Sequence, residues 1–426
     1  MMDLVLTNAT LPDGTRADIA IRDGLIADIA PRFTGEARRT IDVGGHLVSP
    51  PFVDSHFHLD STLTAGIIRH NTSGTLAEGI AIWKELKPTL TEEDIYNRAK
   101  RLCEMAIAKG NLAIRSHVDT SPEEPRAVRA LLALQKDMKP WIDIQLVAFP
   151  QDGFFRMPGA AARLEHALDM GVNLVGGIPH FERTTNEGTQ SIEALFRIAA
   201  DRGLSIDMHC DETDDASSRH AETMAACTIR YGLQGRVAGS HLASMHSIDN
   251  AYAGKLIGML ADAGMCVIAN PLINITLQGR YDTYPKRRGL ARIRELVQAG
   301  VPVGFGHDCV MDPWYRLGSH DMLEVASMGA HVGHMTGEGE LLDCYRAVTE
   351  NAARIMELDG YGLTVGKRAD MVVLQAASPI EALRLRPTRL YVIRAGKVIA
   401  QSPAQTTTLH LDTPPGEQPA RVSGQN

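Results

Sequence analysis

The stretch that decides the fold reads Val53-Asp54-Ser55-His56-Phe57-His58-Leu59-Asp60, and it carries two histidines separated by one apolar residue. If residues 52–58 form a buried strand, side chains two apart share a face, so both imidazoles point one way and Phe57 points the other. Two neutral imidazoles that converge on one point make half of a metal site, although a His-x-His pair alone is more often structural. The remaining chain must therefore supply the other ligands.

The length and charge of the chain narrow its class. At 426 residues the chain exceeds the usual size of one domain, but (β/α) barrels need about 250 residues, so we expect one barrel plus one small domain. A net charge of −8 lacks the basic stripe of proteins that follow a phosphate backbone. We therefore expect no nucleic-acid partner.

The N-terminus and the cysteines indicate the cellular compartment in which the protein is expected. No run of about 18 apolar residues occurs, and the N-terminus has no basic segment followed by an apolar one, which predicts a cytoplasmic protein without a membrane partner. The 6 cysteines contain no Cys-x-x-Cys pair. Such scattered cysteines indicate free thiols in a reducing compartment.

Both ends of the chain have the pattern of short strands. Residues 1–50 alternate apolar runs with Asp13-Gly14 and Asp23-Gly24, which are strong hairpin signals. Residues 366–411 return to this pattern, which favours one small β-sandwich built from both ends. The tail 412–426, rich in proline and glycine and poor in apolar residues, is predicted to be disordered.

Residues 51–365 alternate β-type apolar runs with segments of helical period such as Glu92–Lys109 and Ser191–Arg202. This alternation predicts an α/β fold, a distorted (β/α)8 TIM-type barrel, whose chemistry lies at the carboxyl ends of the strands. The first strand contains His56, and the other seven candidates are Ala113–Val118, Ile142–Phe149, Leu174–Gly177, Ser205–His209, Val237–His241, Cys266–Ala269 and Val301–Asp308.

Metal-binding residue types stand at several of these strand ends. His209, His241 and Asp308 close the fifth, sixth and eighth strands, and the His-x-His pair closes the first. A single histidine at a strand end is commonly structural, because an imidazole can bond to a neighbouring loop. Four such ends surround one mouth of the barrel, however, which favours a shared metal site.

At this point the chain resembles the amidohydrolase superfamily and, within it, the bacterial cytosine deaminases. The resemblance covers nearly the whole chain. The matching segments are residues 50–60, Asn71-Thr72-Ser73-Gly74-Thr75-Leu76, Val147-Ala148-Phe149-Pro150-Gln151, residues 177–182, His209-Cys210-Asp211-Glu212, Ser240-His241, Asn270-Pro271-Leu272-Ile273-Asn274, residues 278–289, Gly306-His307-Asp308 and Asp312-Pro313-Trp314-Tyr315.

The resemblance implies a metal site made by His56, His58, His209 and Asp308, with one position left open for water. This ligand set suits zinc and equally iron(II) or manganese. No lysine stands at residues 175–179, where a bridging carbamylated lysine would be expected, so one metal is predicted rather than two. The His-x-Glu and Pro-Cys-x-x-Cys signature of polynucleotide deaminases is absent as well.

The resemblance also assigns the catalytic roles. Glu212 would protonate the ring nitrogen beside the attacked carbon, Asp308 would take a proton from the water, and His241 would orient that water. The other reading of Glu212 is a solvated loop carboxylate. The predicted reaction is hydrolytic deamination of a pyrimidine base with release of ammonia.

The resemblance places the substrate contacts at five positions. Gln151 would present a donor and an acceptor to the ring edge, and Trp314 would pack against the ring. Leu76 and Phe149 form walls in this interpretation, and they are equally compatible with ordinary core. Cys309 is the fifth contact and departs from the family pattern.

Cys309 stands where the cytosine deaminases have a second aspartate after the metal-binding one. A thiol behaves as a small hydrophobe, whereas a methyl group pressed against a carboxylate strips it of solvation. Our hypothesis is that carbon 5 of the substrate carries a substituent, as in 5-methylcytosine. Neutral drift in an ordinary cytosine deaminase is the alternative.

Two other functions stay open. The chain could hydrolyse another cyclic amidine, such as isoguanine, creatinine or an alkylamino-triazine, or it could be a catalytically dead barrel used for binding. The intact segments around Gln151 and Glu212 favour deamination of a pyrimidine. The resemblance further implies a homo-oligomer.

Overall fold

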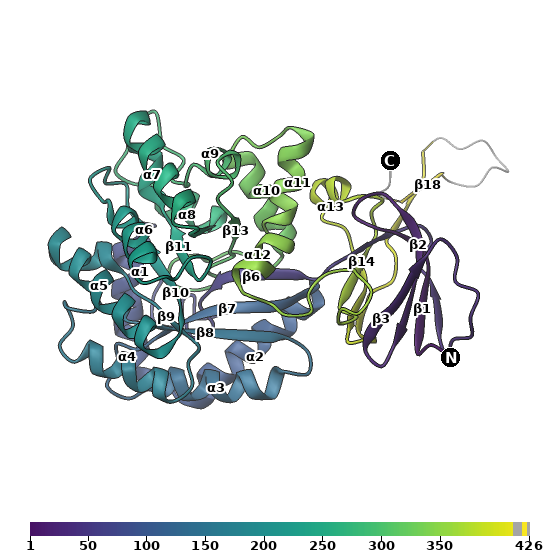
Figure 1. The fold of residues 1–426 in the computed structure, drawn as a ribbon, viewed down its shortest axis with the longest axis horizontal. Helices are drawn as coiled ribbons and strands as arrows, with labels where there is room; N and C mark the ends of the chain where they lie inside the picture. The colour runs from purple at the N-terminus through teal and green to yellow at the C-terminus, as the bar shows by residue number, and fades with distance from the viewer. Residues whose placement is uncertain (412–419, 424–426) are drawn as a thin grey trace. The chain divides into compact units, whose positions relative to one another are not determined.

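The computed structural model describes residues 1–411 and 420–423, and one of its two eight-stranded sheets is a ring of strands in sequence order (Figure 1). Each pair whose register is defined runs parallel, as βαβ connections require. The strands are β6 (Phe52–Phe57), β7 (Asn111–Asp119), β8 (Asp143–Phe149), β9 (Leu174–Val175), β10 (Ser205–Cys210), β11 (Val237–His241), β12 (Cys266–Ala269) and β13 (Val303–Phe305).

The ring closes between its first and last strands. Phe57 forms a parallel bridge with Asp308. The Asp308 amide donates to the His56 carbonyl over 2.9 Å, and the His58 amide donates to the Asp308 carbonyl over 3.1 Å. The structure therefore confirms the predicted (β/α)8 barrel, and its closing seam runs through the first histidine pair.

The barrel strands are largely buried because both of their faces are covered. Every residue of β6, β7, β11, β12 and β13 is buried. The covering helices are α1 (Leu76–Leu86), α2 (Glu92–Ala108), α3 (Arg126–Met138), α4 (Ala160–Asp169), α5 (Thr185–Arg202), α6 (His220–Arg230), α7 (Asn250–Asp262), α8 (Pro271–Leu277), α9 (Ile293–Gln298), α10 (Met322–Val332), α11 (Glu338–Arg346) and α12 (Glu350–Ile355), with short 3-10 turns at Lys87–Thr89, Pro179–Phe181 and Ala243–His246.

Two predicted strands extend too far. The fourth strand ends at Val175 rather than Gly177, and the eighth ends at Phe305, three residues before Asp308. His241 and Asp308 have φ angles of 74° and 68°, in the left-handed region that non-glycine residues rarely adopt. At the barrel mouth, the residues that carry candidate functional side chains thus have backbone angles outside the β region. Strained backbone of this kind is often found at functional sites.

Strands from both chain ends build the second sheet. They are β1 (Leu4–Thr10), β2 (Arg16–Arg22), β3 (Leu25–Ala30), β4 (Thr40–Asp42), β5 (Leu47–Ser49), β14 (Met371–Leu374), β15 (Arg389–Arg394) and β16 (Lys397–Gln401), with helix α13 (Pro379–Leu385) between β14 and β15. This confirms the prediction that both chain ends contribute strands to one small β structure. The strands are connected by hydrogen bonds in the order β16-β15-β14-β5-β1-β2-β3, with β4 beside β1. Its apolar side chains, among them Ile19, Met371 and Ile393, pack into a common core.

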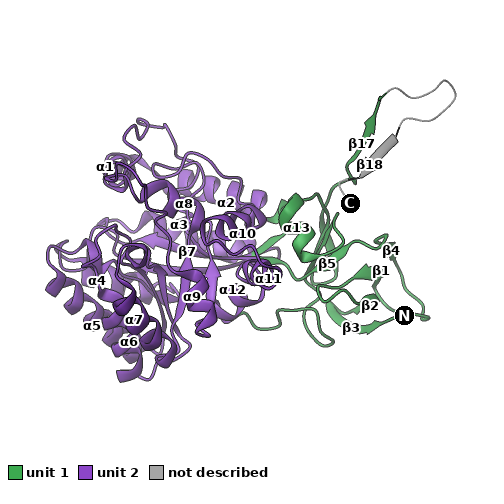
Figure 2. Ribbon diagram, turned by 90° about the horizontal axis from the view of Figure 1, so that it is seen from above, with its two compact units in different colours: residues 1–52, 107–112, 358–426 green, residues 53–106, 113–357 purple. Residues whose placement is uncertain are grey.

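The chain divides into two compact units, shown in Figure 2. One contains residues 1–52, 107–112 and 358–426, and the other contains residues 53–106 and 113–357. The predicted disordered tail mostly lies outside the described residues, but its residues 420–423 form strand β18, antiparallel to β17 (Thr406–Leu409).

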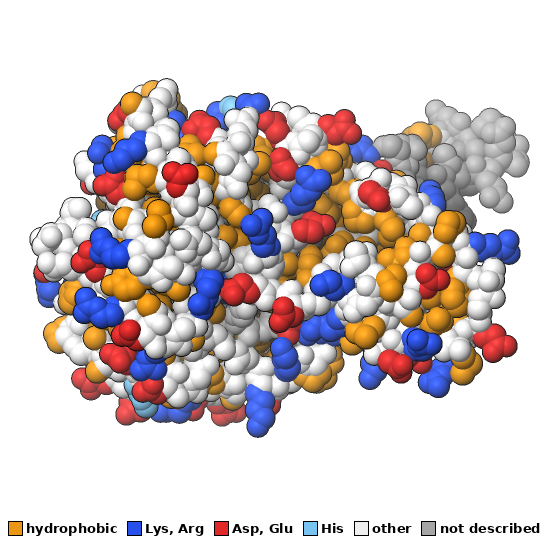
Figure 3. Space-filling view, in the orientation of Figure 1, with side chains coloured by type: hydrophobic (Ala, Val, Ile, Leu, Met, Phe, Trp, Pro, Cys, Tyr) orange, Lys and Arg blue, Asp and Glu red, His pale blue; other side chains and the backbone are white. Residues whose placement is uncertain are grey.

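Helix length and surface charge are the features by which membrane-spanning and strongly charged proteins are recognised. Among the described residues, no helix is long and apolar enough to cross a bilayer. On the face that Figure 3 shows, acidic and basic side chains are interspersed.

Candidate active site

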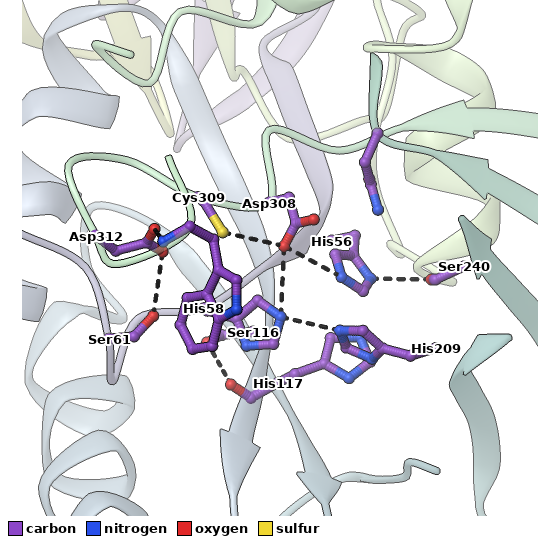
Figure 4. Close-up of polar contacts among 12 residues, drawn as sticks. His56, His58, Ser61, Ser116, His117, His209, Ser240, Asp308, Cys309 and Asp312 are labelled. Carbon is purple, nitrogen blue, oxygen red and sulfur yellow. Dashed lines mark hydrogen bonds and ion pairs between the residues drawn. The ribbon is translucent and has the colours of Figure 1, made fainter. Parts of the chain in front are cut away.

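Four strand ends bring five side chains together, which we call the His-Asp cluster: His56, His58, His209, His241 and Asp308. His58 Nε2 lies 3.0 Å from His209 Nε2 and 3.4 Å from Asp308 Oδ1. His56 Nε2 lies 3.6 Å from the same carboxylate oxygen (Figure 4). His241 Nε2 lies 3.8 Å from the other oxygen, Oδ2. The structure therefore gathers all four predicted ligands and the predicted orienting histidine.

The donor atoms of the cluster fit a divalent cation. The groups His56, His58, His209 and His56, His241, Asp308 each offer ligand atoms within 4.8 Å of one another. Among the described residues, the buried His56 Nε2 has no hydrogen-bond partner, which is costly unless something else occupies its lone pair. Nitrogen and oxygen donors that converge in this way match a site for zinc or a similar ion.

The protonation states of the cluster suit this chemistry. Burial lowers the pKa of His58 to about 3 and lowers the pKa values of His209 and His241 well below the usual range. Burial alone would raise the pKa of Asp308, but the His56 side chain 3.6 Å away and the surrounding histidines lower it overall. His58, His209 and His241 are thus neutral imidazoles beside a carboxylate, which are the forms that bind metals.

A pocket opens directly above the cluster. Its wall includes every predicted site residue except His56, which lies fully buried behind the pocket. These residues are His58, Leu76, Phe149, Gln151, His209, Glu212, His241, Asp308, Cys309 and Trp314. The sequence did not single out the other wall residues, which are Ile80, Ile178, His180, Phe181, Ile273 and Leu277. His180 and Ile273 lie in segments that carried the family resemblance.

Glu212 is held as a buried acid at the wall of this pocket. Its side chain is 5% exposed, and Oε1 lies 3.7 Å from His241 Nδ1. Burial and the negative charge of Asp308 raise the pKa of Glu212 well above its usual value. A protonated carboxyl group in a pocket can donate its proton to a bound substrate. The solvated-loop reading of Glu212 does not fit this environment.

Two asparagines that the sequence analysis missed fix the ring of His241. The Asn274 amide lies 3.0 Å from His241 Nδ1, and the Asn270 amide lies 3.2 Å from the same nitrogen. Both asparagines are fully buried on the segment that begins α8. Their signal was the Asn270-Pro271-Leu272-Ile273-Asn274 motif, in which positions four apart meet on one helix face.

Cys309 and Asp312 organise a further part of the pocket and its surroundings. Cys309 Sγ lies 3.6 Å from Asp308 Oδ1. Burial raises the pKa of this thiol well above its usual value, so the side chain is a neutral thiol. Asp312 Oδ1 accepts the amides of Trp314 and Tyr315, each over 2.9 Å, and this turn sets the position of Trp314. The pocket wall therefore includes a small apolar sulfur and an indole ring.

The barrel and its His-Asp cluster define a class, the metal-dependent hydrolases that work at the carboxyl ends of barrel strands. Comparison with known sequences places the chain within that class. The profile of the Amidohydrolase family matches residues 39–401. The chain therefore belongs to the Amidohydrolase family, which confirms the resemblance seen in its sequence.

Several relatives are similar over nearly the whole chain. The solved structure of 5-methylcytosine deaminase from Klebsiella pneumoniae with 5-fluorocytosine is 40% identical, with a TM-score of 0.92, and the match covers 94% of this chain and 98% of that one. N-isopropylammelide isopropyl amidohydrolase from Pseudomonas sp. (strain ADP) is 30% identical over 94% of this chain and 97% of its own length. Pterin deaminase from Rhizobium rhizogenes is 31% identical over 93% of this chain and 94% of its own length.

Proposed function

We propose that this protein hydrolytically deaminates a 5-substituted cytosine, with 5-methylcytosine as the preferred substrate, giving thymine and ammonia. The observation that carries the proposal is Cys309, a buried neutral thiol that lines the pocket beside Asp308. The similarity at 40% identity to a 5-methylcytosine deaminase supports it. The partner in this proposal is a small pyrimidine base. The homo-oligomeric state stays a prediction from the resemblance, and the cytoplasmic location stays a prediction from the N-terminus and the cysteines.

The proposal includes one divalent metal ion. His56, His58, His209 and Asp308 would hold it, and the donor set suits zinc or iron(II), with manganese also compatible. When bound, such an ion lowers the pKa of a water molecule to about 7 and so supplies a nucleophile at neutral pH.

The protein side chains manage the protons of the reaction. Glu212 donates a proton to the ring nitrogen beside carbon 4, because its carboxyl group is kept protonated by burial. Asp308 takes the proton lost by the attacking water and passes it to the departing amine. Neutral His241, held by Asn274 and directed at Asp308 Oδ2, orients the water. Water adds and ammonia leaves. The second proton of the water, which is lost when the carbonyl forms at carbon 4, returns to Glu212, so Glu212 and Asp308 end in the protonation states in which they began.

Recognition of the ring falls to residues above the cluster. The Gln151 amide can pair with the ring N–H and the carbonyl oxygen at carbon 2, which an analogue without that edge leaves unsatisfied. Phe149 stacks on the ligand ring of His209, with centroids 4.1 Å apart and planes 13° from parallel, and so fixes the wall below the substrate. Trp314 and Leu76 flank the ring.

Replacing Cys309 with aspartate tests the proposed substrate. We expect the wild-type protein to show the higher kcat/KM for 5-methylcytosine and the C309D variant to favour cytosine, with a change in the ratio of about 10-fold or more. Burying one methyl group contributes about 0.8 kcal/mol, roughly fourfold, and desolvation of the new carboxylate adds to this. The measurement is ammonia release with each base, with C309S as the matched control for size.

The result separates the alternatives. A preference for cytosine in both wild type and variant would make the protein an ordinary cytosine deaminase. No ammonia from either base would contradict the proposal and direct the search to other cyclic amidines. An N-alkylamino-triazine would come first in that search, because N-isopropylammelide isopropyl amidohydrolase is 30% identical to this chain.

Gly79 of helix α1 is expected to set the width of the pocket. A Cβ at this position would lie 2.3 Å from Cδ1 and 2.6 Å from Nε1 of Trp314, so only glycine lets the indole pack against the helix. We expect Gly79→Ala to displace Trp314 and to lower kcat/KM about 10-fold or more, since reacting groups misplaced by 1 Å can lose up to about 10²-fold.

The matched control is Gly258→Ala on helix α7, where an added Cβ meets no atom within 4 Å. That variant should keep its activity and gain up to about 1 kcal/mol of stability from helix propensity. Thermal melts and steady-state kinetics of both variants check the pair. Normal kinetics in Gly79→Ala would refute the assigned role of Gly79.

A further inference from the structure

A buried chain of polar groups runs from His56 away from the pocket. His56 Nδ1 lies 2.9 Å from Ser240 Oγ, and Ser240 Oγ donates to Asp207 Oδ1 over 2.6 Å (Figure 4 shows the first of these contacts). All three residues are 0% exposed. No water reaches these groups from bulk solvent, so each hydrogen bond has a large effect on the proton positions of the next.

The direction of each hydrogen bond in this chain of polar groups follows from Asp207, the group farthest from the pocket. Asp207 Oδ2 accepts from the Arg115 guanidinium over 3.1 Å, so Asp207 is an ion-paired carboxylate that can only accept hydrogen bonds. Ser240 has a single hydroxyl proton, and that proton is directed at Asp207. The Ser240 oxygen must therefore accept a hydrogen bond from Nδ1–H of His56.

We propose that Ser240 is a positioning residue that fixes His56 as the Nδ1–H tautomer and thereby presents the Nε2 lone pair to the metal. The inference rests on the proposed function, because it assumes that His56 is a ligand. It agrees with the absence of any hydrogen-bond partner for His56 Nε2. Partners of this kind commonly set the tautomer and orientation of a metal-binding histidine.

Hydrogen bonds hold Arg115, the partner of Asp207, firmly in place, so Asp207 can fix the orientation of Ser240. Arg115, a fully buried arginine on β7, also donates to the Ile355 carbonyl over 2.8 Å and to Gln145 Oε1 over 3.1 Å. In the sheet, Ser240 on β11 lies directly beside His209 on β10. The serine is therefore held at the level of the cluster by strand register rather than by a loop.

The Ser240→Ala variant tests the proposal through metal affinity. We expect the dissociation constant for zinc, measured by competition with a chelator, to rise about 10- to 100-fold, as is typical when such a partner is lost. Ser240→Cys keeps the volume and weakens the hydrogen bonds, and it should give an intermediate value. It also guards against a failure of the alanine variant to fold.

A second measurement tests directly which ring nitrogen of His56 carries the proton. In zinc-loaded protein labelled with ¹⁵N-histidine, the Nδ1–H proton of His56 should exchange slowly with solvent, and the S240A variant should lose this protection. The matched control is Ser55→Ala, which removes a buried hydroxyl of β6 that donates to the Phe305 carbonyl over 3.1 Å and does not touch a ligand ring. Its zinc affinity should equal that of the wild type.

The outcomes are distinct. Unchanged zinc affinity in S240A, or an equal loss in S55A, would overturn the role of Ser240 while leaving the proposed function intact. A wild-type protein that binds no divalent ion would overturn both proposals together.

Discussion

Replacing Glu212 with glutamine is expected to lower kcat by about 10²- to 10⁴-fold, the usual contribution of one acid–base group, while leaving metal content and fold unchanged. The amide keeps the size of the side chain but cannot give up a proton. Burial and the charge of Asp308 already keep Glu212 neutral, so the substitution changes no net charge in the pocket. The loss should therefore fall on kcat more than on KM, because proton donation matters most in the transition state.

The control for Glu212 is the same substitution at Glu222 on helix α6. That carboxylate accepts from the Tyr252 hydroxyl over 3.1 Å and does not line the pocket. Glu222→Gln should keep the wild-type rate. Near-normal turnover in Glu212→Gln, measured at full metal occupancy, would show that another group protonates the ring.

The parts of the fold that the sequence predicted well are those with strong local signals. Strands β11 and β12 begin and end at the predicted residues. β12 is a short, wholly apolar run that stops before Asn270-Pro271, a pair that disfavours strand structure. The alternation around Phe57 also holds: His56 and His58 face the cluster, whereas Phe57 packs against His320 on the other side, with ring centroids 4.7 Å apart. Period-two patterning fixes such faces before any tertiary contact is known.

The errors occur where the backbone leaves regular geometry. Asp308 was placed at the end of a strand, but it follows β13 in a left-handed conformation and is positioned by its bridge to Phe57. The sequence shows no sign of that bridge, since its two residues are 251 positions apart. The pairing of β14 with β5, which joins the two chain ends, could not be read from the sequence for the same reason, although the shared β structure was predicted.

The supporting residues of the cluster were missed for a related reason. Asp207, Ser240 and Asn270 are ordinary polar residues in buried segments, and their roles depend on the register between strands that are not adjacent in the sequence. The metal-ligand residue types, in contrast, are conspicuous wherever they follow a strand. The sequence therefore predicted the candidate ligands but not the groups that orient them.

His209→Ala is expected to abolish metal binding and to reduce turnover at least about 10³-fold, because the water would keep a pKa far above neutral. His209 Nε2 lies 3.0 Å from His58 Nε2, so its loss removes one donor and leaves the facing imidazole without its neighbour. Three remaining donors hold an ion less tightly than four, and the neighbouring buried groups are left unsatisfied. Elemental analysis after gel filtration measures the metal directly.

Treating the wild-type protein with a chelator separates loss of the ion from loss of the fold. The stripped wild type should lose activity to the same extent as His209→Ala and regain it when zinc or iron(II) is added, whereas the variant should not recover. His246→Ala is the control, since this imidazole bonds to Asp214 over 2.9 Å outside the cluster and should leave metal content unchanged. If His209→Ala kept both its metal and its activity, the four-ligand site would be wrong, and His241 would become the next candidate, because it also lies beside His56 and Asp308.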